Sequence, residues 1–165
     1  MINWGSFYGI ITAIYDTWSG TEGVTGCSKI MTVQGRDGSI VNFVITPTTY
    51  FVEHVMMSIG DMVIGYYDLN APVPLIYPPQ LQAIVMAKLV PEYNVKVDYF
   101  DEQLISRDGS LRLNIGPYTQ LVLENDQAFT RNPANHDLIV LYGPTTKSIP
   151  AQTTPYKIIV ICPKI

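Results

Sequence analysis

Charged residues are scarce in this chain of 165 residues, and their balance is negative. Only 15% of the residues are charged, whereas 47% are hydrophobic, and the net charge is −4. A chain with so many apolar side chains can bury a packed core, which excludes general disorder. The negative charge also argues against nucleic acid as a partner, because binding to phosphates requires a basic surface.

Cysteine and histidine are rare, with two of each. Cys27 and Cys162 lie in different halves of the chain, and we interpret them as free thiols rather than as a disulfide framework. His54 and His136 stand singly, outside any spacing typical of metal ligands. We therefore expect neither a metal site nor another cofactor.

Catalytic motifs are also missing. The sequence contains no nucleophile elbow, Walker loop, HExxH or CxxC motif. The nearest approach to an acid–base pair is the cluster of Asp98, Asp101 and Glu102 after a predicted strand. Carboxylates in such a loop are usually solvated turn residues. We predict no catalytic residues and therefore no enzyme.

Long apolar runs are absent. No run approaches the ~20 residues of a membrane-spanning helix, so no transmembrane segment is expected. The amino-terminal stretch MINWGSFYG lacks the basic and apolar regions of a signal peptide. On these residues alone, the protein is expected to be cytoplasmic, unless a leader is missing from the sequence.

The chain is instead rich in residues that form strands and turns. Twelve prolines and twelve glycines separate runs of Val, Ile, Thr and Tyr, a pattern typical of short strands. Strands are predicted in the first half at 7–15, 30–34, 40–45 with a continuation at 50–52, 62–67 and 81–89. The second half is predicted to repeat this order, with strands at 95–100 and at 111–115 with a continuation at 120–123. Its last two strands are predicted within 136–161.

One stretch occurs twice, at residues 60–86 and 136–161, and an offset of 76 residues aligns the two copies. The alignment keeps a Pro-x4-Pro spacing and pairs Asp61 with Asp137, Tyr66 with Tyr142, Pro74 with Pro150, and Pro79 with Pro155. A fixed period is the signature of a repeated structural unit. The chain is therefore predicted to be one module used twice.

A repeated turn supports the same division. Arg36-Asp37-Gly38-Ser39 recurs as Arg107-Asp108-Gly109-Ser110, at an offset of 71. Asp-Gly between two apolar runs predicts a hairpin with a type I′ turn, in which glycine adopts a positive φ. We place the domain boundary after residue 90, which gives the predicted domains 1–90 and 91–165.

The predicted order of strands favours a particular architecture. A first strand, a hairpin, a variable connection and two final strands joined by a long loop match an OB-like Greek-key barrel. Closure also hides the sheet edges in a unit of about 70–75 residues. We therefore predict an all-β protein of two tandem OB-like five-stranded barrels, with a β-sandwich as the alternative.

Tyrosine carries the functional prediction. The chain has eleven tyrosines, and five flank two proline-rich loops, 68–79 and 143–155: Tyr66, Tyr67, Tyr77, Tyr142 and Tyr156. Rings beside prolines on an exposed loop offer flat faces with polar tips, which suit a glycan or a peptide. The alternative is that the rings pack on the prolines and hold the loops rigid.

Several segments resemble a known family: V-D-Y-F-D at 97–101, L-I-V-L-Y at 138–142, S-I-P-A-Q-T-T-P at 148–155 followed by K-I-I-V-I, and A-P-V-P-L-I-Y-P-P-Q at 71–80. They resemble a module of clostridial and related Firmicutes proteins. That module usually lies ahead of a domain similar to the N-terminal stalk domain of copper amine oxidases. The resemblance covers nearly the whole chain and implies an exported or cell-surface setting without catalytic activity. It carries over no ligand residues.

Two functions follow as expectations. The first is a non-catalytic binding or adaptor module of the cell envelope, acting on a glycan, a peptide or an envelope protein. The second is a self-associating structural protein of an envelope or spore layer, which the low charge and edge-prone apolar strands favour. The sequence does not predict an oligomeric state.

Overall fold

The computed structural model describes residues 1–163 and shows an all-β protein. The chain divides into two compact units, Met1–Leu89 and Val90–Ile165, and each unit has its own hydrophobic core. The predicted second domain ends at residue 165, and its last two residues lie outside the described part.

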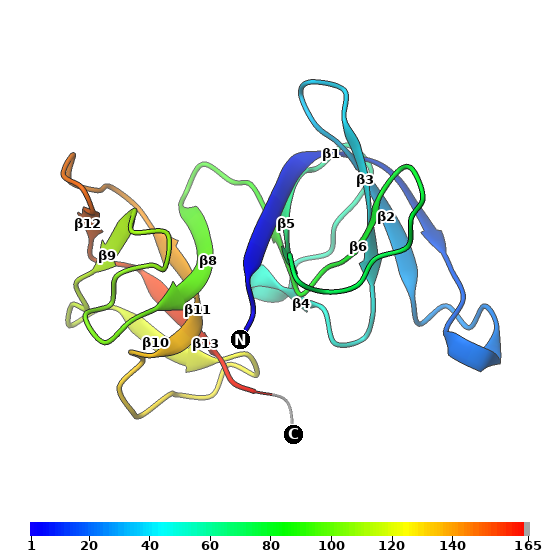
Figure 1. Ribbon diagram of the computed structural model, residues 1–165. Helices are drawn as coiled ribbons and strands as arrows, with labels where there is room; N and C mark the ends of the chain where they lie inside the picture. Colours follow the sequence, from blue (N-terminus) through cyan, green and yellow to red (C-terminus); the bar gives the residue numbers. More distant parts are fainter. Residues whose placement is uncertain (164–165) are drawn as a thin grey trace. The chain divides into compact units, whose positions relative to one another are not determined.

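The first unit contains one seven-stranded sheet in the order β4-β7-β5-β1-β2-β3-β6. Its elements are β1 (Trp4–Asp16), η1 (Gly20–Glu22), β2 (Lys29–Gln34), β3 (Ile40–Ile45), β4 (Tyr50–Phe51), η2 (Val52–His54), β5 (Met62–Asp68), β6 (Gln80–Gln82) and β7 (Val85–Lys88). Figure 1 shows the course of these strands, from dark blue β1 to green β6, and the residues of the first core come from them and from the segments between them. An irregularity between Ile11 and Ala13 bends β1, so that its first half pairs with β5 and its second half with β2.

One segment, residues 80–88, contributes to both sides of this sheet, with β6 at one edge and β7 next to the other edge. Its β6 part pairs in parallel with β3, whereas its β7 part pairs with β5 and β4. The prediction of a single strand at 81–89 is therefore wrong. The chain changes partners at the break, where Ala83 N–H donates to Val44 O (3.1 Å) and Ile84 N–H donates to Tyr66 O (2.8 Å).

The second unit has fewer residues in regular strands. It contains β8 (Asn94–Phe100), β9 (Leu111–Leu113), β10 (Gln120–Leu123), β11 (His136–Tyr142), β12 (Ala151–Thr153) and β13 (Lys157–Ile161). These strands form the orders β10-β13-β11-β8 and β12-β9. The predicted loop 143–155 thus includes a short strand. Single bridges, Phe100 to Ser106 and Ile105 to Arg112, occupy the place that β2 has in the first unit.

Matching hydrogen bonds occur in the two units. The Thr49 hydroxyl accepts the Thr46 N–H (3.1 Å) and donates to Ala83 O (2.9 Å). The Thr119 hydroxyl likewise accepts the N–H of residue 116 (3.1 Å) and donates to Pro155 O (2.7 Å). In both units a threonine therefore joins the turn before a short strand to the backbone that precedes the last strand.

These bonds correct the residue-by-residue alignment. Tyr66 O accepts the Ile84 N–H, and Leu141 O accepts the Tyr156 N–H (both 2.8 Å), so Tyr66 corresponds to Leu141. The offset at this strand is 75 residues rather than 76, and Tyr142 corresponds to Tyr67. Pro155 takes the place of Ala83, as the threonine bonds show. The Pro-x4-Pro match in the sequence is therefore not a structural match.

The hairpin turns also differ from the prediction in one respect. Gly38 and Gly109 have positive φ angles of 88° and 76°, as predicted. The predicted type I′ turn, with Asp37 and Gly38 at its centre, is wrong. Gly38 N–H donates to Gly35 O (3.0 Å), so the two central residues of the turn are Arg36 and Asp37. Gly35 N–H then donates to Ser39 O (2.8 Å) and closes a three-residue loop. A type I turn followed by a left-handed glycine is the usual form of such a loop.

Replacing Thr49 with valine is expected to destabilise the first unit by about 2 kcal/mol, because the Thr46 N–H and the buried Ala83 C=O lose their partner while the side-chain shape is kept. Urea unfolding followed by circular dichroism measures the change. Thr48→Val is the control, since Thr48 is exposed. Equal midpoints for the two variants would contradict the structural role of Thr49.

Candidate functional site

A groove of about 250 Å³ lies beneath the proline-rich loop of the first unit. Its walls come from three strands and the loop: Val44 of β3, Tyr67 and Asp68 of β5, Gln80–Gln82 of β6, and Ala71–Pro74 of the loop. The groove thus combines an aromatic ring, proline rings and two side-chain amides. Such a mixture of apolar surface and a few polar groups is typical of ligand sites.

The start of the loop is held by Asp68. One oxygen of its carboxylate accepts the N–H groups of Asn3 (3.1 Å) and Asn70 (3.0 Å). Leu69 N–H donates to Asn3 O (2.7 Å), and Ala71 N–H donates to Asp68 O (3.1 Å). Asp68, which lines the groove, therefore stabilises the start of the loop and fixes the direction in which the loop leaves β5.

The loop itself is uncharged and strongly exposed. No charged residue occurs from Leu69 to Ala87. Leu75 is fully exposed, and Tyr77 is 79% exposed. Large apolar side chains in one contiguous exposed segment are uncommon on monomers and mark contact surfaces. The loop therefore offers an apolar surface beside the groove.

The five predicted tyrosines have different environments and do not form one site. Tyr66 is only 4% exposed, which removes it from any contact surface. Tyr67 lines the groove, but it also packs against the core, with its ring 6.4 Å from that of Phe43. Tyr77 alone among the first three presents most of its ring to solvent.

The two tyrosines of the second unit divide in the same way. Tyr142 packs against the second core, as its counterpart Tyr67 packs against the first. Tyr156 is 51% exposed, and its hydroxyl occupies the space that a side chain at Gly143 would need. Tyr67 and Tyr142 are therefore held by the cores of their units, whereas Tyr77 and Tyr156 present half or more of their surface to solvent.

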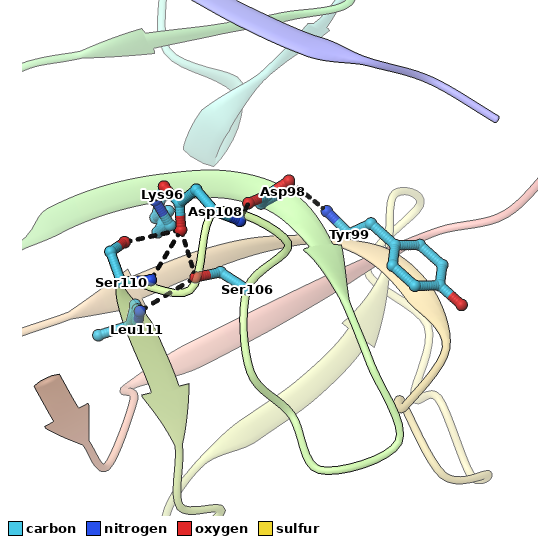
Figure 2. A network of polar contacts seen from close by, with 7 residues as sticks. All are labelled: Lys96, Asp98, Tyr99, Ser106, Asp108, Ser110 and Leu111. Atoms are coloured by element: carbon cyan, nitrogen blue, oxygen red, sulfur yellow. Dashed lines mark hydrogen bonds and ion pairs between the residues drawn. The ribbon is translucent and has the colours of Figure 1, made fainter. Parts of the chain in front are cut away.

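One member of the predicted acidic cluster, Asp98, belongs to a polar network of the second unit (Figure 2). Asp98 accepts the N–H groups of Tyr99 (2.8 Å) and Asp108 (3.2 Å). Asp101 accepts those of Gln103 (2.8 Å) and Ile105 (3.0 Å). Asp98 and Asp101 are therefore occupied with backbone donors of β8 and of the loop that follows it, which stabilises this loop.

Asp108 is the centre of this network. One oxygen of its carboxylate accepts from the Ser106 hydroxyl (2.6 Å) and from the N–H and hydroxyl of Ser110 (3.0 and 2.8 Å), and the other lies 2.6 Å from Lys96 Nζ (Figure 2). Burial by itself raises the pKa of the Asp108 carboxyl. The bonds from Lys96, Ser106 and Ser110 outweigh burial and hold the pKa well below 3.8.

The residues considered for metal binding do not come together. Within residues 1–163, no three His, Cys, Asp or Glu side chains are placed to hold a metal ion. Cys27 and Cys162 are exposed free thiols, as predicted. His136 Nδ1 lies 2.9 Å from Ala134 O, and His54 stacks edge-on against Tyr50.

The sequence did not indicate a second pocket in the first unit, of about 340 Å³. Its lining residues are Tyr8, Gly9, Ile10, Thr12, Gln34, Gly35, Arg36 and Met62. Two features of the sequence point to it in retrospect. Tyr8 and Ile10 are apolar at consecutive outward positions of β1, and Gly9 lies between them where a side chain would collide with the backbone at Gln34.

Comparison with protein-family models, with curated proteins and with solved structures gives no match. The similarity to the clostridial module therefore stays a prediction from the quoted segments. Within residues 1–163, no helix has the length and apolar character needed to cross a membrane.

Proposed function

We propose that this protein is a non-catalytic binding module whose recognition element is the proline-rich loop of the first unit, together with the groove beneath it. The observation that carries the proposal is the exposure of Leu75 and Tyr77 on an uncharged loop beside a 250 Å³ groove. Prolines restrict the loop before contact, so binding costs little conformational entropy. An uncharged glycan or an apolar peptide suits this surface better than an ionic ligand.

The scaffold in this proposal is a pair of OB-like barrels that arose by duplication. The corresponding orders of strand pairing support it, as do the matching bonds of Thr49 and Thr119. In the first unit, the segment 80–88 pairs with strands on both sides of the sheet, as closure into a barrel requires. Further support comes from Gly60 and Asn135, which both have positive φ and donate an N–H to the first strand of their own unit, at Ile11 of β1 and Phe100 of β8.

The cellular setting in this proposal is the cell envelope. It rests on the resemblance of the proline-rich segments to the Firmicutes module, with a cytoplasmic location as the alternative. The partner would then be a wall glycan, a peptide or an envelope protein.

A pull-down with purified cell wall and with envelope proteins tests the binding proposal. Replacing both Leu75 and Tyr77 with alanine is expected to weaken binding about tenfold or more, because exposed anchors of this kind carry most of the energy of a contact. Tyr118→Ala is the matched control, since Tyr118 is a 93% exposed tyrosine in the second unit. Unchanged binding by the loop variant, with an unchanged melting temperature, would contradict the proposal.

A second candidate function is self-association into a structural layer. The observation that favours it is the size of the apolar surface on the loop, where five large side chains are at least 46% exposed: Leu69, Val73, Leu75, Ile76 and Tyr77. Exposed apolar surfaces of this kind are usually covered by a partner in the functional state of a protein, and here the partner would be another copy of the chain.

A further inference from the structure

The 340 Å³ pocket of the first unit has a distinct chemical character. Its lining includes the apolar residues Ile10 and Met62, and Tyr8, an aromatic residue that is 56% exposed. Three of the lining residues have polar side-chain groups: Tyr8 a hydroxyl, Gln34 an amide and Arg36 a guanidinium. All three can donate hydrogen bonds, and the guanidinium cannot accept one.

A proline-rich extended chain has the complementary character. Each proline lacks an N–H but keeps its carbonyl, so such a segment has more acceptors than donors. Aromatic-lined grooves recognise extended proline-rich segments because these are already ordered before binding. A pocket whose lining includes apolar residues, an exposed tyrosine and side chains that can donate therefore fits an uncharged proline-rich strand.

The chain exposes a segment of this kind. Residues 72–79 contain four prolines and no charge. Leu75 is fully exposed, Ile76 is 52% exposed and Tyr77 is 79% exposed, so none of these side chains is covered by its own unit. The loop and the pocket thus match in polarity and in their donors and acceptors.

The loop cannot fill the pocket of its own chain. It leaves β5 at Asp68, whereas the pocket includes Met62 at the other end of this seven-residue strand. The two ends are separated by about 20 Å, from the rise of 3.3 Å per residue. The loop is also held elsewhere, because Ala71–Pro74 line the other groove and Pro79 O accepts the Asn42 N–H (2.9 Å).

We propose that residues 72–79 of one copy bind in the pocket of Tyr8, Ile10, Gln34, Arg36 and Met62 on a second copy. This inference rests on self-association, the second candidate function, and assigns it two different surfaces. A contact between unlike surfaces leaves one loop and one pocket free in each pair, so further copies add head to tail. The contact is small, which places its affinity in the range of weak, transient interfaces.

Two variants and analytical ultracentrifugation test the pairing. The loop variant carries Leu75→Asp and Ile76→Asp, and the pocket variant carries Tyr8→Ser and Arg36→Glu. The average mass of the wild type is expected to rise with concentration, whereas each variant alone stays monomeric. An equimolar mixture of the two variants is expected to form a dimer and nothing larger, because only one intact loop and one intact pocket remain to pair.

The control is Ile149→Asp, which changes a 96% exposed apolar residue in the second unit and is expected to associate like the wild type. Circular dichroism melts check that both variants fold, and a variant that fails is replaced by its single substitution Leu75→Asp or Arg36→Glu. A wild type that stays monomeric overturns self-association altogether. A wild type that associates, with a variant mixture that stays monomeric, overturns only the pairing of loop and pocket. Neither result bears on the cell-wall pull-down.

Discussion

Replacing Gly65 with valine is expected to lower the free energy of unfolding of the first unit by about 3 kcal/mol, since overpacking a rigid core has costs of this size. Gly65 lies on β5 under the ring of Phe43, and a Cβ there would come within 2.5 Å of the ring. Phe43 is fully buried in the first core, and close packing of a core confines such a ring. Urea unfolding of the variant and the wild type measures the difference.

The second unit suggests a compensating change. At the offset of 75, Val140 takes the place of Gly65. Leu113 takes the place of Phe43, because Leu113 pairs with Thr153, two residues before Pro155, as Phe43 pairs with Leu81, two residues before Ala83. Val140 and Leu113 are both buried in the second core. The double variant Gly65→Val with Phe43→Leu is therefore expected to be more stable than Gly65→Val alone by about 1 kcal/mol or more, because residues in contact are coupled. Strictly additive effects of the two substitutions would contradict this account of the core.

Replacing Asp108 with asparagine is expected to destabilise the second unit by about 2 kcal/mol at pH 7. Hydrogen bonds to a charged group contribute about 1.5–3 kcal/mol, and the sum over this network is discounted because the Asp108 side chain is 51% exposed and screened by solvent. Asparagine keeps the shape, but it loses the charge that faces Lys96 and one of the acceptor oxygens.

The effect of Asp108 depends on pH in a defined direction. Its pKa in the folded protein lies below the ordinary value of 3.8, so its contribution is complete well above pH 3.8 and is lost as the pH falls below that value. The difference between wild type and Asp108→Asn is therefore expected to shrink from pH 6 to pH 2. Asp37→Asn is the matched control. It alters the equivalent turn, where Ser39 binds the carboxylate, and is expected to have the smaller effect. A constant difference across this pH range would contradict the assigned role.

The strands themselves were largely predictable, because apolar runs between turn residues determine where they lie. Trp4–Asp16 was predicted as 7–15, and the hairpin strands of the first unit agree within one residue, whereas the strand predicted at 111–115 ends at Leu113. The break at Ala83 and Ile84 was not predictable in this way. The run 80–88 has enough apolar residues to predict a single strand. It breaks because β6 pairs with β3 whereas β7 pairs with β5, and these partners are far away in the sequence.

The candidate site was predicted only in part. The proline-rich loop and the exposed Tyr77 follow from composition, since an uncharged run with prolines cannot be helical and lies at the surface. The sequence could not separate Tyr66 from Tyr67, which are neighbours on one strand but face different surroundings. The alignment offset was misleading for a similar reason. Identical letters suggested 76 residues, whereas backbone hydrogen bonds require 75.

The pairing of residues 80–88 on both sides of the sheet has a consequence for the order of folding. Pairing of β6 with β3 and of β7 with β5 cannot form until the last part of the unit is available, so the hairpin of β2 and β3 must wait for its final neighbour. Topologies dominated by such distant pairings fold slowly, on the millisecond to second scale. During synthesis, the first unit therefore stays open until Lys88 has left the ribosome. It can then close while the second unit is still being made, because the units of a chain generally fold one at a time from the amino terminus.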